Sequence, residues 1–250
     1  MDFTVLTLFP ELVGSFFEHG MILRGIEKKL ITGHCINIRD FSTDRHNTVD
    51  DRPYGGGSGM VMKPEPLQVA ILAAKKRTPE SPVVLLTPQG TRFNQEKAMA
   101  LASKNEGLIF VCGRYEGIDE RIYATLVDEE ISIGDYVMTG GELASMVIID
   151  SIARLIPGVL GSLESSKSDS FTDERLEYAQ YTRPEDFEGL KVPDVLLSGN
   201  HEKIDQWRKK SSLQHTFLKR PDLFKKTELS AEEKIIIKQW CQELEILVRE

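Results

Sequence analysis

Short apolar runs alternate with stretches of helical periodicity over the first 160 residues. The runs at residues 3–9, 83–86 and 108–112 are apolar or β-branched and end at turn-forming residues, which is typical of buried parallel strands. Residues 66–76 place apolar side chains at helical spacing, and residues 96–104 also favour a helix. This alternation predicts an α/β domain with a mostly parallel sheet.

The pattern changes after residue 140. Residues 141–156 are strongly apolar and end at Pro157, so we expect a buried helix there. Residues 162–173 contain six serines and threonines, several charges and almost no apolar residue. Such a composition favours a linker, or a loop that becomes ordered only on binding.

Helical patterns follow in the last part of the chain. Asn200 or Ser198 is the expected N-cap of a helix through residue 218, and a capping box at residues 230–233 precedes a helix to the C-terminus. The sequence therefore predicts an α/β domain, a linker and a small helical domain, at residues 1–160, 161–174 and 175–250.

The composition argues against several classes of protein. Apolar residues make up 40% of the 250 residues and charged residues 28%, a balance that excludes a disordered chain. Three widely spaced cysteines without a CxxC motif argue against a disulfide framework and common zinc spacings. The sequence lacks an apolar run long enough to span a membrane and the features of a secretory signal. We therefore expect a cytoplasmic protein.

Positive charge is concentrated in one segment of a chain whose net charge is −8. Residues 201–226 carry eight lysines and arginines against three carboxylates, with Trp207, His215 and Phe217 between them. Cations interleaved with aromatic rings suit contact with an RNA backbone and stacking on bases. The same pattern also fits an amphipathic helix with aromatic core anchors and a solvated basic face.

A glycine-rich segment lies at residues 44–59. Gly55, Gly57 and Gly59 match a GxGxG pattern, but the pattern follows polar residues instead of an apolar strand, so it is a weak sign of a nucleotide site. The acidic residues of this segment also raise the hypothesis of a metal-dependent phosphoesterase. The residues for that chemistry are Asp44, His46, Asp50 and Asp51.

Three further glycine-bearing loops follow apolar runs, at residues 86–90, 112–119 and 131–141. Ligands of open α/β sheets bind outside the carboxyl ends of the strands. Three such loops together predict a binding site, in which Glu116 could accept a hydrogen bond from a ligand amine.

Several motifs in these loops and beyond them together identify a family. They are Asp44-Arg-His46, Thr48-Val-Asp-Asp-Arg-Pro-Tyr-Gly-Gly-Gly57, Pro88-Gln-Gly90, Cys112-Gly-Arg-Tyr-Glu-Gly-Ile-Asp-Glu-Arg121, Ser132-Ile-Gly-Asp-Tyr136, Thr139-Gly-Gly-Glu-Leu143, Arg154-Leu-Ile-Pro-Gly-Val-Leu-Gly161, Asp169-Ser-Phe171, Tyr181-Thr-Arg-Pro184 and Val195-Leu-Leu-Ser-Gly-Asn-His201. In this order, over nearly the whole chain, they closely resemble the bacterial tRNA (guanine-N1)-methyltransferases of the SPOUT superfamily.

The resemblance implies a fold and an activity. The fold is a SPOUT-type parallel sheet with a C-terminal trefoil knot at the methyl-donor site, a topology that pattern reasoning would not reach. The activity is methyl transfer from S-adenosylmethionine to N1 of the guanosine immediately 3′ of the tRNA anticodon, position 37. The family is homodimeric, with each active site built from both chains.

Roles for individual residues also come from the resemblance. Asp169, supplied by the partner chain, matches the general base, and Arg154 matches the arginine that stabilises charge on O6. The residues that match the cofactor pocket are Leu86, Thr87, Pro88, Gln89, Gly90, Gly113, Tyr115, Glu116, Ile133, Gly134, Asp135, Tyr136, Val137, Met138, Gly140 and Gly141. For the tRNA substrate we expect Gly59, Asp50, His201 and Lys209.

The resemblance also bears on a metal ion and on one substitution. The family is associated with Mg²⁺, although the sequence has no dedicated metal cage. Ala144 stands where the family usually has proline, which could loosen the cofactor loop slightly. The alternative to an enzyme is a non-catalytic RNA-binding protein that uses only the basic C-terminal helices.

Overall fold

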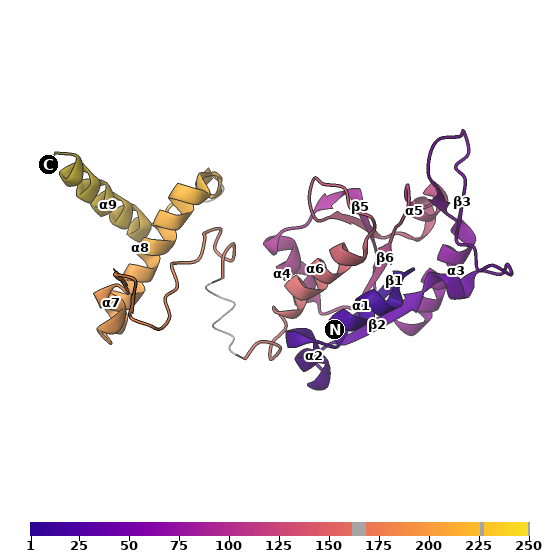
Figure 1. The fold of residues 1–250 in the computed structure, drawn as a ribbon, viewed down its shortest axis with the longest axis horizontal. Helices are drawn as coiled ribbons and strands as arrows, with labels where there is room; N and C mark the ends of the chain where they lie inside the picture. The colour runs from indigo at the N-terminus through magenta and orange to yellow at the C-terminus, as the bar shows by residue number, and fades with distance from the viewer. Residues whose placement is uncertain (162–168, 226–227, 250) are drawn as a thin grey trace. The chain divides into compact units, whose positions relative to one another are not determined.

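A computed structural model gives the structure of residues 1–161, 169–225 and 228–249. The chain divides into two compact units, Met1–Leu163 and Glu164–Glu250, which are described here one at a time (Figure 1). The boundary between the two units lies after residue 163, whereas the sequence led us to expect the first domain to end at residue 160. Half of the linker expected at residues 161–174, residues 162–168, lies outside the described residues, and residues 169–174 belong to the second unit.

The first unit is built on a five-stranded sheet in the order β2-β1-β6-β5-β7, in which every neighbouring pair is parallel. The strands are β1 (Asp2–Thr7), β2 (Thr32–Asn37), β5 (Val83–Arg92), β6 (Leu108–Cys112) and β7 (Glu129–Ser132). The predicted α/β class with a parallel sheet is confirmed. Strand β5 runs six residues beyond the predicted end at residue 86.

Helices cover both faces of this sheet, as the first unit in Figure 1 shows. One face packs against α1 (Pro10–Phe17), α2 (Gly20–Glu27), α4 (Gln95–Lys104) and α6 (Glu142–Ala153). The other packs against the 3-10 helix η1 (Ile38–Phe41), α3 (Pro64–Arg77) and α5 (Glu120–Leu126).

Side chains alternate between the two cores along each central strand. In β6, Leu108 and Phe110 belong to one apolar cluster, whereas Ile109 and Val111 belong to the other. Successive side chains of a strand point to opposite faces, so a strand buried on both faces must be apolar throughout. This is why the central strands appear in the sequence as unbroken apolar runs.

The ends of the helices follow local rules. Pro10 occupies the first turn of α1, where its missing N–H costs nothing. Helix α6 ends at Ala153, three residues before the predicted end. The N–H groups of Leu155 and Ile156 instead bind carbonyls three residues back, at 2.9 and 3.1 Å, so the last turn tightens before Pro157.

A short antiparallel hairpin, β3 (Asp50–Asp51) with β4 (Val61–Met62), joins β2 to α3 in this unit. The second unit contains a hairpin, β8 (Asp186–Phe187) with β9 (Leu190–Lys191). Its helices are α7 (Asp194–Leu197), α8 (His201–Lys219), the 3-10 helix η2 (Pro221–Lys225) and α9 (Ala231–Arg249). Among the described residues, no helix is long and apolar enough to cross a membrane.

The predicted caps of α8 and α9 are confirmed. The Asn200 side chain accepts a hydrogen bond from the Lys203 N–H at 3.1 Å. The Ser230 hydroxyl accepts from the Glu233 N–H at 3.2 Å, and the Glu233 carboxylate accepts from the Ser230 N–H at 2.7 Å. This reciprocal pair is a capping box.

The chain before α7 packs along α8 through backbone-to-hydroxyl hydrogen bonds. The N–H of Leu176 donates to Thr216 Oγ1 and the N–H of Ala179 donates to Ser211 Oγ, both at 2.9 Å. Thr216 and Ser211 are buried, so these bonds satisfy polar groups that would otherwise be costly to bury. An irregular segment is thus held against the helix without a strand.

A substitution at Gly90 tests how closely β5 packs against β7. A Cβ at this position would lie 2.5 Å from the carbonyl carbon of Glu130, and backbone atoms paired in a sheet cannot move aside. We expect Gly90→Ala to destabilise the first unit by about 1–3 kcal/mol. Urea unfolding followed by far-UV circular dichroism measures the change.

Gly14 provides the matched control, because it lies in α1 and a Cβ added there would meet no atom within 4 Å. We expect Gly14→Ala to stabilise the unit by up to about 1 kcal/mol, since alanine favours a helix. Equal stabilities for the two variants would contradict the close packing at Gly90.

Candidate functional site

A cavity of about 320 Å³ opens beside the middle of β5 and the carboxyl ends of β6 and β7. The three glycine-bearing loops singled out in the sequence form its wall. All but two of the predicted cofactor residues line it. Those that do are Leu86, Thr87, Pro88, Gln89, Gly113, Tyr115, Glu116, Ile133, Gly134, Tyr136, Val137, Met138, Gly140 and Gly141.

An irregularity in β5 makes the first loop. Leu86 and Thr91 both pair with Ile131 of β7, so residues 87–90 leave the ladder between them. The strand therefore continues past the cavity while Thr87, Pro88 and Gln89 are turned into its wall. Irregularities of this kind commonly redirect side chains beside functional sites.

The other two loops pack tightly on each other. The N–H of Gly141 donates to the carbonyl of Gly113 at 3.1 Å. A Cβ on Gly141 would lie 2.8 Å from the Cα of Cys112, so no larger residue fits at this approach. The absence of a side chain lets the backbone of the third loop reach the end of β6.

Gly90 and Asp135 are the two predicted residues that do not line the cavity. Gly90 is turned toward β7, where its Cα faces the backbone of Glu130 and Ile131. Asp135 has an 88% exposed side chain, 3.8 Å from Arg92 Nη1. Their assignment to the cofactor remains a prediction that this geometry does not favour.

Several lining residues were missed by the sequence reasoning. Arg114 and Thr139 lie inside the predicted motifs, next to residues that were chosen, so their position was a usable signal. Tyr123 comes from α5 and no motif marks it. Burial raises the pKa of Tyr123, and a hydrogen bond with Thr87 partly opposes this effect. Ala144, in the first turn of α6, also lines the cavity.

A buried carboxylate connects the parts of this wall. Glu142, at the start of α6, has a 1% exposed side chain. Its Oε1 accepts from the hydroxyl of Thr7 at 2.7 Å, and its Oε2 accepts from Arg114 Nε at 3.0 Å. Arg114 also donates to the carbonyl of Thr139 at 3.1 Å and lies 4.4 Å from the ring centre of Phe9. These contacts fix β1, α6 and two of the cavity loops in one arrangement.

Cys112 lies beside this network and is fully buried. Burial raises the pKa of its thiol well above the ordinary value, and the negative charge of Glu142 raises it further, against opposing effects of Ser145 and Arg114. The thiol is therefore protonated at neutral pH, which makes it a packing group and a poor nucleophile.

The β3–β4 hairpin is attached to the cavity by main-chain hydrogen bonds. The N–H of Glu116 donates to the Met60 carbonyl and the N–H of Met62 donates to the Gly117 carbonyl, both at 3.0 Å. A Cβ on Gly59 would come within 2.6 Å of Glu116 Cγ. The structure thus brings Gly59 directly against Glu116, and Asp50 lies on the same hairpin opposite Met62.

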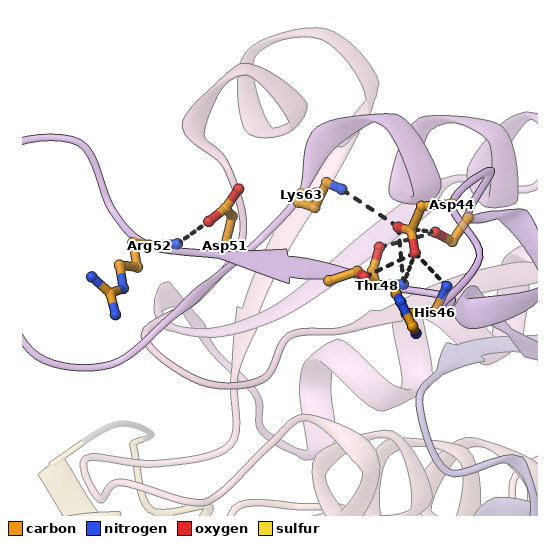
Figure 2. A network of polar contacts seen from close by, with 7 residues as sticks. Asp44, His46, Thr48, Asp51, Arg52 and Lys63 are labelled. Carbon is orange, nitrogen blue, oxygen red and sulfur yellow. Dashed lines mark hydrogen bonds and ion pairs between the residues drawn. The ribbon is translucent and has the colours of Figure 1, made fainter.

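Asp44 organises the loop before this hairpin (Figure 2). Its carboxylate accepts from the His46 N–H at 2.8 Å, from the Thr48 hydroxyl at 2.9 Å and from the Ser42 hydroxyl at 3.0 Å. Desolvation opposes ionisation of Asp44, but these donors outweigh it and lower the pKa to about 2. Asp44 is therefore ionised at neutral pH and bound by its own loop.

The remaining acidic residues of this segment do not join Asp44. In Figure 2, Asp51 lies apart from the Asp44 network and accepts a hydrogen bond from the Arg52 N–H, at 2.7 Å. Among the residues that the structure describes, no three His, Cys, Asp or Glu side chains are close enough to hold a metal ion. The phosphoesterase hypothesis therefore gains no support.

A second cavity, of about 370 Å³, lies within the helical unit and is lined by Asp169, Arg175, Lys209 and Glu232, among others. Two of the predicted residues, Asp169 and Lys209, thus meet here. His201 begins α8 and is exposed. Arg154 is exposed at the C-terminus of α6, in the first unit.

A model of the family described as tRNA (Guanine-1)-methyltransferase TrmD matches residues 1–226 of this sequence. The chain belongs to this family. The match includes the whole first unit and helix α8. The first cavity therefore lies within it, whereas the second is lined partly by residues beyond 226.

Curated relatives extend the similarity to the whole chain. A protein of Carboxydothermus hydrogenoformans is 55% identical over 250 residues, which is 100% of this chain and 98% of that protein. One from Desulfatibacillum aliphaticivorans is 53% identical over 249 residues, 100% and 95% of the two chains. One from Bacillus cereus is 53% identical over 245 residues, 98% of each chain. All three are named tRNA (guanine-N(1)-)-methyltransferase.

Substitution of Glu142 tests how much the buried network stabilises the cavity wall. Glu142→Ala leaves Arg114 without its buried partner, and we expect a loss of about 3–5 kcal/mol in the free energy of unfolding. Glu142→Gln keeps an acceptor for Thr7 and should lose less. Urea unfolding checks both values.

Glu96 is the matched control, because it occupies the first turn of α4 but is exposed. Glu96→Ala should cost at most about 1 kcal/mol, the contribution of a carboxylate near a helix N-terminus. Similar losses for Glu142→Ala and Glu96→Ala would show that the buried network contributes little.

Proposed function

We propose that this protein transfers a methyl group from S-adenosylmethionine to N1 of the guanosine at position 37 of tRNA, immediately 3′ of the anticodon. The observation that carries the proposal is the cavity beside β5 and the carboxyl ends of β6 and β7. Its wall consists of the loops that the family resemblance assigns to the methyl donor, in a chain that belongs to a tRNA (guanine-1)-methyltransferase family.

The chemistry of this wall fits S-adenosylmethionine. At about 320 Å³, the cavity falls in the range of small-molecule sites, which are mostly apolar with a few polar groups. Leu86, Ile133 and Met138 offer apolar contacts for an adenine ring, and the backbone of residues 133–138 offers hydrogen-bonding groups. When bound, the cofactor supplies an electrophilic methyl group.

The reaction requires two further groups from the protein. N1 of guanine carries a proton and is a poor nucleophile, so methylation needs a base within reach of that proton. Negative charge then develops on O6, where a guanidinium stabilises it. We assign these roles to Asp169 as general base and Arg154 as the O6-stabilising cation. Asp50 and Gly59, on the hairpin beside Glu116, would contact the target base.

We also propose a homodimer in which Asp169 comes from the partner chain. Helices α1 and α6 of the first unit are in contact. Leu12 in α1, Leu143 and Val147 in α6, and Phe9 at the N-cap of α1 are large apolar residues that are 46–55% exposed. Exposed apolar side chains that gather on neighbouring elements are typical of a protein interface. The close approach of Gly141 to Cys112 supports a compact threading of the loops, which we propose is the family's trefoil knot.

For tRNA binding we propose the helical unit over residues 175–250, with His201 and Lys209 on α8. The residues of 161–174 would connect it to the methyltransferase domain over residues 1–160. A tRNA substrate implies that the protein works in the cytoplasm. Among the described residues, no three His, Cys, Asp or Glu side chains are close enough to hold Mg²⁺.

Methyl transfer to two tRNA transcripts tests the reaction. One transcript carries guanosine and the other adenosine 3′ of the anticodon, with labelled S-adenosylmethionine as donor. We expect label on the guanosine transcript alone, and a loss of about 10²–10⁴-fold in rate for Asp169→Ala. Label on both transcripts would overturn the target position. No label, with tRNA still bound, would favour the non-catalytic RNA-binding alternative.

Mixing two inactive variants tests the composite active site. Asp169→Ala and Arg154→Ala each lack one required group in both sites of a homodimer. Heterodimers would combine an intact Arg154 from one chain with an intact Asp169 from the other at one of their two sites. Re-equilibrated mixtures should therefore recover about a quarter of the wild-type rate. Activity no higher than that of the separate variants would place both groups in one chain's site.

A further inference from the structure

Two lysines in the basic segment of α8 form ion pairs with glutamates of α9. Lys209 Nζ lies 2.8 Å from both carboxylate oxygens of Glu232. Lys210 Nζ lies 2.8 and 2.6 Å from the two oxygens of Glu243. The positive charge that the sequence assigns to this segment is therefore partly neutralised within the unit.

The two glutamates have a regular placement. They are eleven residues apart, which is three helical turns, so they share one face of α9 and are separated by about 16 Å along its axis. Each accepts from a lysine of α8 through both of its oxygens. Two anionic groups are thus held against α8 at separate positions along α9.

These ion pairs are accessible to a competing anion. The four side chains are 34–58% exposed, and ion pairs with this exposure contribute only about 0–1 kcal/mol each. Lys209 and Glu232 also line the 370 Å³ cavity of the helical unit, together with Arg175. An anion that replaced the Glu232 carboxylate would therefore find space beside Lys209. Arg175 already donates to Glu233 Oε1 at 3.1 Å, and Asp169, Asp173 and Glu228 also line this cavity, so Lys209 is the cation on which the exchange depends.

We propose that the α8–α9 seam, defined as Lys209, Lys210, Glu232 and Glu243, is an RNA phosphate-binding surface that works by exchange. In the free protein, the two glutamates occupy the lysines. When RNA binds, backbone phosphates take the place of the carboxylates on Lys209 and Lys210. The inference rests on the proposed tRNA substrate, and it adds Lys210 and an opposing role for α9.

Exchange predicts how the two glutamates and the two lysines affect RNA affinity. Each glutamate competes with phosphate for its lysine and also repels a phosphate a few ångströms away. Removing both carboxylates should strengthen RNA binding, whereas removing both lysines should weaken it. If the pairs only stabilise the helical unit, loss of either partner would leave RNA affinity unchanged.

Binding of a tRNA transcript at fixed ionic strength tests the proposal, since RNA affinity depends on salt. We expect Glu232→Gln/Glu243→Gln to bind about three- to tenfold more tightly than wild type, and Lys209→Gln/Lys210→Gln to bind more weakly. The control pair Glu188→Gln/Glu202→Gln makes the same change in net charge, at exposed positions with no ion pair among the described residues. Equal gains for the two glutamate pairs, or no gain for the seam pair, would overturn the proposal.

Carbodiimide labelling of the wild-type protein provides a test that does not depend on a variant folding. Exchange predicts that Glu232 and Glu243 become more reactive when tRNA is added, while Glu188 does not change. Unchanged or reduced labelling of both glutamates would overturn the proposal. Methyl transfer measured on the same samples separates the two ideas: active enzyme without release of the glutamates contradicts exchange alone, and inactive enzyme contradicts the proposed function.

Discussion

The buried carboxylate of Glu142 is the constraint on which the candidate site depends. An ionised group with a 1% exposed side chain is tolerated only when its oxygens are paired. Thr7 and Arg114 supply those pairs, and they come from β1 and from the loop after β6. Satisfying one carboxylate therefore fixes the relative positions of three segments that are distant in sequence. The cavity exists because these segments meet.

The sheet explains why so much could be predicted from the sequence. Strands buried on both faces must be apolar throughout, so β1 and β6 were visible as short runs, and the residues after parallel strands must meet at one edge. Pattern reasoning thus located the three cavity loops. The roles of Asp169 and Arg154 came only from the family resemblance, because an acid in a polar segment and an arginine at a helix end have no local signature.

Other features depended on contacts that no local pattern encodes. The excursion at residues 87–90 lies between Leu86 and Thr91, which both pair with Ile131 of β7, and a strand's partner cannot be read from its own sequence. Gly90 resembled a loop glycine for the same reason, although it packs against β7. Similarly, the charge of residues 201–226 was visible, but its neutralisation by Glu232 and Glu243 depends on how α9 crosses α8.

The two units divide the chemistry in a way that links binding to catalysis. Arg154 belongs to the sheet unit and Asp169 to the helical unit, so neither unit alone carries both of the groups that we propose for methylation of N1. Asp169 lines the same cavity as Lys209 and Arg175. In the proposed exchange, a phosphate that replaces Glu232 on Lys209 would change the charge around this cavity when RNA binds. The proposed exchange would therefore couple substrate binding to the environment of the proposed base through Lys209, and would give the helical unit a part in the reaction beyond affinity.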